Sequence, residues 1–285
     1  MYFEIGPKSR KEDFFNYESE YGQVKKSLEQ GEKIIAVVGV RRVGKTSLLN
    51  ILYNEEKNLK IWLDGRIISD PKKEVFYAEY EVAKTGKAKI FGSIDSFSVS
   101  AFGVGLNVKI EPIALSSMEK KIREAGRVRI FIDEAQEMDR KALANVLSYF
   151  YDRFPKVSFI ISGSEIGLVE EILGETDSEH PLYGRSIQKI LVERLDKNKA
   201  AEFLEKGFSQ LDNGATKSEI TDAIKELDGL IGWLTLFGYE KAVMKNKDAL
   251  KKTIEVASRV AATELVNFLK KTKNKRLYLL ILRNA

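Results

Sequence analysis

Residues 34–47 read IIAVVGVRRVGKTS, an apolar run followed at once by a loop with a glycine near each end. Residues 34–38 are all apolar and lie between Gly31 and Gly39, a pattern typical of a buried β-strand. Residues 46–54, TSLLNILYN, have the pattern of a helix. The sequence therefore predicts a strand, a tight loop and a helix in succession, which is the unit from which α/β proteins are built.

The loop matches the pattern G-x-x-x-x-G-K-[ST], whose fixed positions each have a chemical reason. Its two glycines let the backbone approach an anion closely, so that successive N–H groups and the following helix N-terminus face a phosphate. Lys45 supplies a positive charge for the β- and γ-phosphates, the Thr46 hydroxyl suits Mg²⁺, and Ser47 is a candidate α-phosphate contact. The predicted nucleotide-binding residues are Gly39, Val40, Arg41, Arg42, Val43, Gly44, Lys45, Thr46 and Ser47. The alternative is a glycine-rich turn with an incidental lysine, which would not need the flanking strand and helix.

A second predicted strand, residues 128–132, has four apolar residues and ends in Asp133-Glu134. In α/β sheets the carboxyl ends of the strands are where ligands bind, so both carboxylates are expected at that edge. Asp133 is a candidate ligand of Mg²⁺ through water, and Glu134 a candidate catalytic residue that polarises the attacking water. Gln136 either senses the γ-phosphate or lines the loop. The alternative for the acidic pair is that it only begins a solvated loop.

Further candidate catalytic residues lie at the end of one predicted strand and just before another. The run at residues 157–161 ends in Ser162-Gly163-Ser164. We favour Ser162 as a γ-phosphate contact and Ser164 as the N-cap of a helix at 165–173. Arg185 precedes the last predicted strand and could place positive charge on the γ-phosphate, as phosphoryl transfer requires. A surface arginine in a salt bridge is the alternative, and composition does not separate the two.

The pattern of apolar residues divides the chain into parts. Strands alternate with helices over residues 1–193, which predicts an α/β domain with a mostly parallel sheet. Within it, residues 89–111 alternate in polarity around a glycine-containing bend, which predicts a β-hairpin insertion. Residues 194–276 contain only helical patterns and predict an all-α domain. The apolar residues 277–285 predict the start of a truncated further domain.

Composition excludes several classes of protein. The 285 residues include no cysteine and one histidine, His180, so disulfides and thiol catalysis are excluded and a Ser-His-Asp triad is disfavoured. No apolar run approaches about 18 residues and the N-terminus has no apolar signal segment, so we expect no membrane span and a cytoplasmic location. The net charge of +5 permits contact with nucleic acid without demonstrating it.

Residues 39–49, GVRRVGKTSLL, together with residues 131–136, FIDEAQ, resemble the archaeal ATPase family, P-loop proteins of the AAA+/STAND group. Other signatures of that family are similar to ISGS at 161–164, PLYGR at 181–185 and GWLT at 232–235. The resemblance implies an α/β P-loop NTPase fold with a five-stranded, mostly parallel sheet. It also implies a helical lid over 194–276 and a winged-helix domain that would start near Leu277.

The resemblance further implies ATP or ADP and Mg²⁺ as ligands. It makes Arg185 similar to a family arginine that acts on the γ-phosphate in cis or in a neighbouring subunit. Two departures limit what carries over. Family members commonly have Arg-Glu where Tyr17-Glu18 stands, and Gly-x-Pro in the lid, where residues 228–232 have no proline. Contacts from these two segments to adenine and phosphate are therefore not transferred.

The function predicted from these features is an ATP-binding and ATP-hydrolysing P-loop ATPase that works as a nucleotide-driven conformational switch. Glu134 favours ATP hydrolysis, because nucleotide binding alone does not require this residue. The alternative is a non-hydrolysing ADP/ATP-binding interaction module, and a small-molecule kinase is a third class. Besides nucleotide, the candidate partners are DNA, through a winged-helix domain missing from this chain, and a second copy of the chain.

Overall fold

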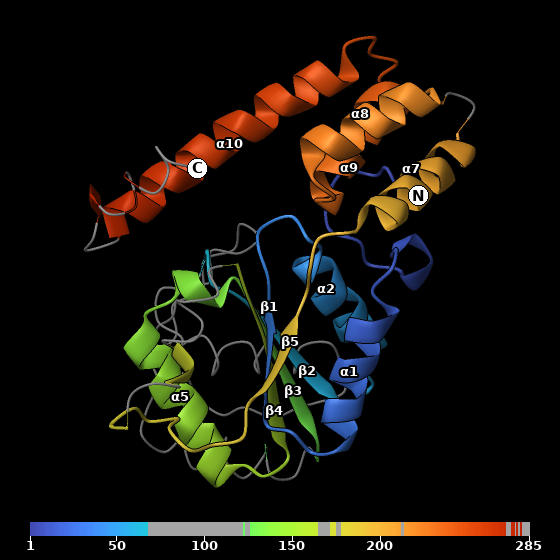
Figure 1. The fold of residues 1–285 in the computed structure, drawn as a ribbon. Helices are drawn as coiled ribbons and strands as arrows, with labels where there is room; N and C mark the ends of the chain where they lie inside the picture. Colours follow the sequence, from blue (N-terminus) through green and yellow to red (C-terminus); the bar gives the residue numbers. More distant parts are fainter. Residues whose placement is uncertain are drawn as a thin grey trace, which may run out of the picture. The chain divides into compact units, whose positions relative to one another are not determined.

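The computed structural model describes residues 1–67, 122, 126–164, 172–174, 178–211, 214–271, 275, 276, 278 and 280. It divides into two compact units, Pro7–Glu193 and Met1–Gly6 with Arg194–Ala285 (Figure 1). The expected hairpin at 89–111 and most of the helix expected at 165–173 lie outside the described residues, as does most of 277–285.

The first unit contains a five-stranded sheet in the order β2-β3-β4-β1-β5. Its strands are β1 (Ile34–Val38), β2 (Leu59–Asp64), β3 (Val128–Asp133), β4 (Val157–Gly163) and β5 (Gln188–Leu191). Every pairing between neighbours is parallel, which confirms the predicted α/β fold. β3, β4 and β1 are consecutive in the sheet, so their carboxyl ends are neighbours.

Helices cover both faces of this sheet. The helical segments described in this unit include η1 (Lys11–Asp13), α1 (Glu18–Glu29), α2 (Lys45–Glu55), η3 (Ala135–Glu137) and α5 (Arg140–Arg153). In Figure 1, α5 lies on one side of the sheet and α1 and α2 lie on the other. Alternate residues of β1 (Ile34, Ala36 and Val38) join α5 in one apolar cluster. Because successive strand side chains point to opposite faces, Ile35 and Val37 are buried on the side of α2.

The second unit is helical, with α7 (Lys197–Ser209), α8 (Lys217–Leu227), α9 (Ile231–Gly238), η4 (Tyr239–Val243) and α10 (Ala249–Lys271). Phe3 is fully buried in it and packs edge-on against Phe203 and Phe208. A side chain at Gly207 or Gly238 would collide with the Phe3 ring. The first six residues therefore belong to the helical unit, and Phe3 is part of its core, which no local pattern in the sequence indicates.

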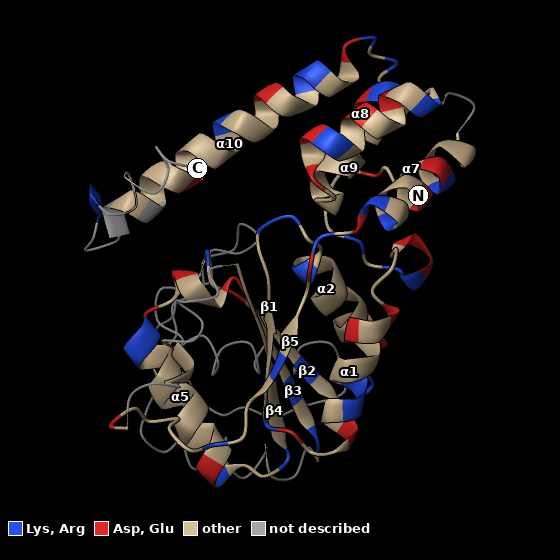
Figure 2. Ribbon diagram, in the orientation of Figure 1, with Lys and Arg blue, Asp and Glu red and all other residues tan. Residues whose placement is uncertain are grey.

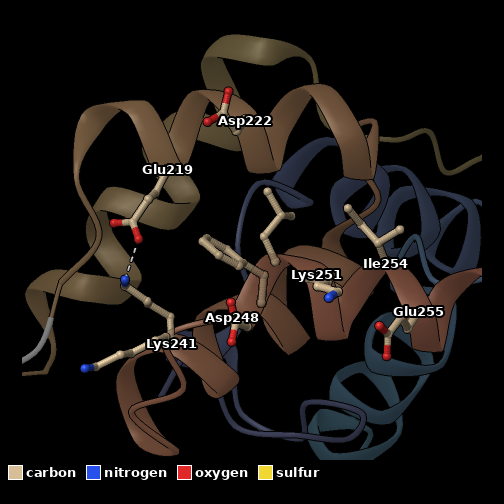
Figure 3. Close-up of a pocket in the computed structure, with 11 residues that line it drawn as sticks. Glu219, Asp222, Lys241, Asp248, Lys251, Ile254 and Glu255 are labelled. Atoms are coloured by element: carbon tan, nitrogen blue, oxygen red, sulfur yellow. Dashed lines mark hydrogen bonds and ion pairs between the residues drawn. The ribbon is translucent and has the colours of Figure 1, made fainter.

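A hollow of about 530 Å³ opens among α8, η4 and α10 (Figure 3). Its apolar lining includes Phe237 and Ile254, and an ion pair of 2.5 Å joins Lys241 to Glu219 at its rim. Lysines and acidic residues both line it, and Lys and Arg alternate with Asp and Glu along α7, α8 and α10 (Figure 2). The hollow therefore does not single out an anionic ligand. Among the residues that the structure describes, no helix is long and apolar enough to cross a membrane.

Candidate functional site

All of the predicted site residues except Arg185 gather at the carboxyl edge of the sheet because of its topology. The glycine-rich loop follows β1, Asp133 ends β3, and Ser162 lies near the end of β4. These three strands are neighbours and parallel, so their carboxyl ends meet at one edge. This is where open α/β sheets form ligand crevices.

The loop between β1 and α2 needs both of its glycines. A Cβ on Gly39 would lie 2.3 Å from the carbonyl oxygen of Val192, so no other residue fits without moving that backbone. Gly44 has φ 105°, in the left-handed region that glycine favours, and α2 begins at the next residue. The result is a tight turn whose helix N-terminus is suited to an anion.

Lys45 is folded back over the loop that precedes it. Its ammonium donates to the carbonyl oxygens of Gly39 at 2.8 Å and Val40 at 2.9 Å, and the side chain is only 5% exposed. A cation held by two carbonyl oxygens at the mouth of an N–H-rich loop can exchange those oxygens for phosphate oxygens. The position is the one that the sequence pattern requires of this lysine.

Thr46 and Asp133 are brought together from α2 and β3. The Thr46 hydroxyl donates to Oδ2 of Asp133 at 2.9 Å, and Asp133 is 1% exposed. Burial raises the pKa of Asp133, and hydrogen bonds from Ser162 and Thr46 oppose that rise. A carboxylate beside a hydroxyl is the hard oxygen donor set that Mg²⁺ takes when phosphate and water complete its shell. The two residues therefore fit the magnesium site predicted for them.

Ser162 is fully buried beneath this pair. Its hydroxyl donates to Oδ1 of Asp133 and accepts from the backbone N–H of Glu134 at 3.3 Å. Both hydrogen bonds of the hydroxyl therefore serve to orient Asp133 and Glu134. The predicted contact of Ser162 with a γ-phosphate stays a prediction, because the described contacts of the hydroxyl are to Asp133 and Glu134.

Glu134 stands at a sharp turn immediately after β3. Its φ of 51° lies in the left-handed region, which is uncommon for a residue other than glycine. The end of β2 packs closely against this turn: the Gly65 N–H donates to the Asp133 carbonyl at 2.8 Å, and a Cβ on Gly65 would lie 2.3 Å from the Glu134 carbonyl oxygen. The Glu134 carboxylate is contacted by Gln136 and Ser164.

Arg66 is a residue near the site that the sequence did not single out. It follows β2, pairs with Asp64 at 2.5 Å, and interacts electrostatically with Asp133 and Glu134. The adjacent Asp64 raises the pKa of the Arg66 guanidinium. Strand order could have indicated Arg66, since Asp64 ends a strand that is paired with β3. A residue after such a strand reaches the same edge as the acidic pair.

Arg185 is not brought to this edge. It lies three residues before β5, whose first residue pairs with Ile35, whereas the glycine-rich loop leaves β1 after Val38. Those two ends of the paired stretch are on the order of 10 Å apart, at ~3.3 Å per residue. The guanidinium binds Asp152 at 2.8 Å and the Pro181 carbonyl, on the amino side of the sheet. Within one chain, Arg185 is the salt-bridged arginine of the alternative interpretation.

The N-terminal segment supports the loop from outside. The hydroxyl of Tyr17 donates to the Val43 carbonyl, the ring is 2% exposed, and burial raises its pKa. The Lys8 N–H donates to the Ser47 hydroxyl at 2.9 Å. Tyr17, at the place where the resembling family commonly has arginine, therefore packs against the glycine-rich loop and holds one of its carbonyls.

Known protein families and solved structures include several that are similar to this chain. Residues 14–237 match a family described as an ATPase domain predominantly from Archaea. A Walker-type ATPase of Pyrococcus abyssi is similar, with TM-score 0.75 and 32% identity over 95% of this chain and 80% of that chain. Cdc6p from Pyrobaculum aerophilum has TM-score 0.54 and 15% identity over 80% of this chain and 62% of its own, a likeness of fold alone. A comparison with curated proteins gave no match.

Proposed function

We propose, from the premise that this chain belongs to the family of ATPase domains found predominantly in Archaea, that it binds ATP with Mg²⁺ and hydrolyses it as a conformational switch. The observation that carries the proposal is the contact of Thr46 with the buried Asp133, beside the glycine-rich loop. Binding of nucleotide alone does not need a further carboxylate next to Asp133, and Glu134 provides one.

In this proposal each residue has one task. The N–H groups of the loop and the Lys45 ammonium bind the β- and γ-phosphates. Thr46 and Asp133 hold Mg²⁺, which offsets the negative charge of the triphosphate. Glu134 accepts a hydrogen bond from water and aligns it for attack on the γ-phosphorus. The water oxygen bonds to phosphorus, the bond to the bridging oxygen breaks, and the proton of the water passes to the Glu134 carboxylate. ADP and inorganic phosphate leave.

Turnover should depend on the divalent cation. We expect ATP hydrolysis by the wild-type chain in Mg²⁺ to fall at least ~100-fold when excess EDTA is added, and to return when Mg²⁺ is restored, because charge neutralisation is a large part of this catalysis. The measurement is phosphate release at saturating ATP. Absence of turnover in Mg²⁺, with tight retention of ADP, would instead favour the non-hydrolysing interaction module.

The position of Arg185 leads to a second prediction, that it acts on the site of a neighbouring copy. Arg185→Ala has an intact loop, and Lys45→Ala has an intact Arg185, so a mixture of the two variants should regain turnover that neither shows alone. Arginines that act in this way contribute roughly 10³-fold or more to kcat. Phosphate release across a range of mixing ratios measures the recovery.

The matched control for this mixture is Arg153→Ala, which removes an arginine of α5 that lies over the Tyr149 ring. It should leave turnover unchanged. Turnover of Arg185→Ala equal to that of the wild type would mean that the ion pair with Asp152 is the whole role of Arg185.

Association with DNA through a winged-helix domain stays a prediction from the resemblance.

A further inference from the structure

The amide of Gln136 lies against Glu134 and is almost completely buried, with 4% of the residue exposed. It belongs to η3, which begins directly after Glu134. Its Nε2 donates to Oε2 of Glu134 and to the Ser164 hydroxyl at 2.9 Å, and its Oε1 accepts from the Ser164 N–H at 3.2 Å. Both ends of the amide therefore have partners.

These contacts define which way the amide points. The backbone N–H of Ser164 can only donate, so the atom that faces it must be the amide oxygen. The nitrogen is then left to face the Glu134 carboxylate, which can only accept when ionised. Ser164 also contributes its hydroxyl, 3.3 Å from the same carboxylate oxygen. The end of β4 therefore orients Gln136, and Gln136 in turn holds Glu134.

The neutral amide of Gln136 suits a Glu134 carboxylate that must accept a hydrogen bond from water. A lysine or arginine in the same place would pair its full charge with the carboxylate and weaken its ability to accept a proton or a hydrogen bond from water. A neutral amide orients one oxygen and leaves the other available. The Glu134 side chain has three rotatable bonds, so an unheld carboxylate would sample several positions.

We propose that Gln136, itself oriented by Ser164, is the positioning residue for Glu134. Through Gln136, the end of β4 is linked to the hydrolytic step. The inference rests on the proposed function. Gln136 is given no contact with nucleotide, so its effect should appear in kcat and not in binding. A displacement of about 1 Å in a group that aligns a reactant costs up to ~100-fold in rate.

The test is steady-state ATP hydrolysis by Gln136→Met, which keeps the length of the side chain and removes its hydrogen bonds. We expect kcat to fall roughly 10- to 100-fold, with KM and the Kd for ADP within about 3-fold of wild type. Ser164→Ala, which removes one hydroxyl, should give a smaller loss of kcat in the same direction. Gln23→Met on α1 is the matched control and should behave as wild type.

A double-mutant cycle distinguishes positioning from a general structural role. If Gln136 acts through Glu134, Gln136→Met should cause no further loss of turnover in a Glu134→Gln background. Losses that add in the double variant, or a raised KM and Kd with kcat unchanged, would overturn the inference. Should Gln136→Met unfold, the Ser164→Ala cycle decides in the same way. Absence of wild-type turnover would refute the proposed function, whereas normal turnover of Gln136→Met beside an inactive Glu134→Gln refutes this inference alone.

Discussion

Glu134→Gln should lower kcat for ATP hydrolysis by roughly 10²- to 10⁴-fold and leave the Kd for ATP within about 2-fold of wild type. The range is that of general base catalysis by a positioned side chain. The substitution removes the charge but preserves the shape. Its amide oxygen can still accept from Gln136, so the turn after β3 keeps its contacts. Single-turnover phosphate release and equilibrium binding of a fluorescent ATP analogue measure the two quantities.

The matched control is Glu137→Gln, directly after Gln136 and three positions after Glu134, where the carboxylate pairs with Arg41 at 3.6 Å. It changes the same charge near the same turn and should affect kcat by less than about 3-fold, as surface ion pairs contribute little. Normal turnover by Glu134→Gln would remove Glu134 from the hydrolytic step. Loss of ATP binding would assign it to binding instead.

The central sheet was predictable because local sequence carries its signals. β1, β3 and β4 are buried along their whole length, so their residues are mostly apolar, interrupted in β3 by Arg129 and in β4 by Ser158. The glycine-rich loop adds a pattern with strict spacing. Asp139 was identifiable as a helix start in the same local way, and its side chain accepts from the Ala142 N–H at 2.7 Å.

The connections within the site were not predictable, since they depend on strand order. Ser162 meets Asp133 and Gln136 meets Ser164 only because β3 and β4 are neighbours, and 28 positions separate Gln136 from Ser164 in the chain.

The placement of Arg185, by contrast, could have been predicted from the sequence. A residue that precedes a parallel strand lies at the amino edge of a sheet, away from the carboxyl edge where the glycine-rich loop leaves β1. The burial of Phe3 had no such signal, because its partners are about 200 residues away.

Lys45→Ala should weaken binding of both ATP and ADP by at least ~100-fold, about 2.7 kcal/mol, and abolish turnover. The ammonium is the one side-chain cation that the loop pattern directs to the β- and γ-phosphates. In the free chain it is already held at the loop by the carbonyls of Gly39 and Val40. Little side-chain ordering therefore remains to oppose binding, and the loss on truncation is correspondingly large. Isothermal titration with each nucleotide measures the change.

The control for this prediction must separate lost affinity from a disturbed loop, since truncation also leaves two carbonyl oxygens without their donor. Lys60→Ala removes a comparable lysine on β2, whose ammonium binds the Tyr53 carbonyl at 2.7 Å, and it should leave nucleotide affinity unchanged. A Tm of Lys45→Ala close to that of Lys60→Ala would show that the loop is intact and that the lost affinity belongs to the phosphate contact. Unchanged affinity with a lowered Tm would mean that Lys45 serves only to hold Gly39 and Val40, and that the phosphates are bound by backbone N–H groups alone.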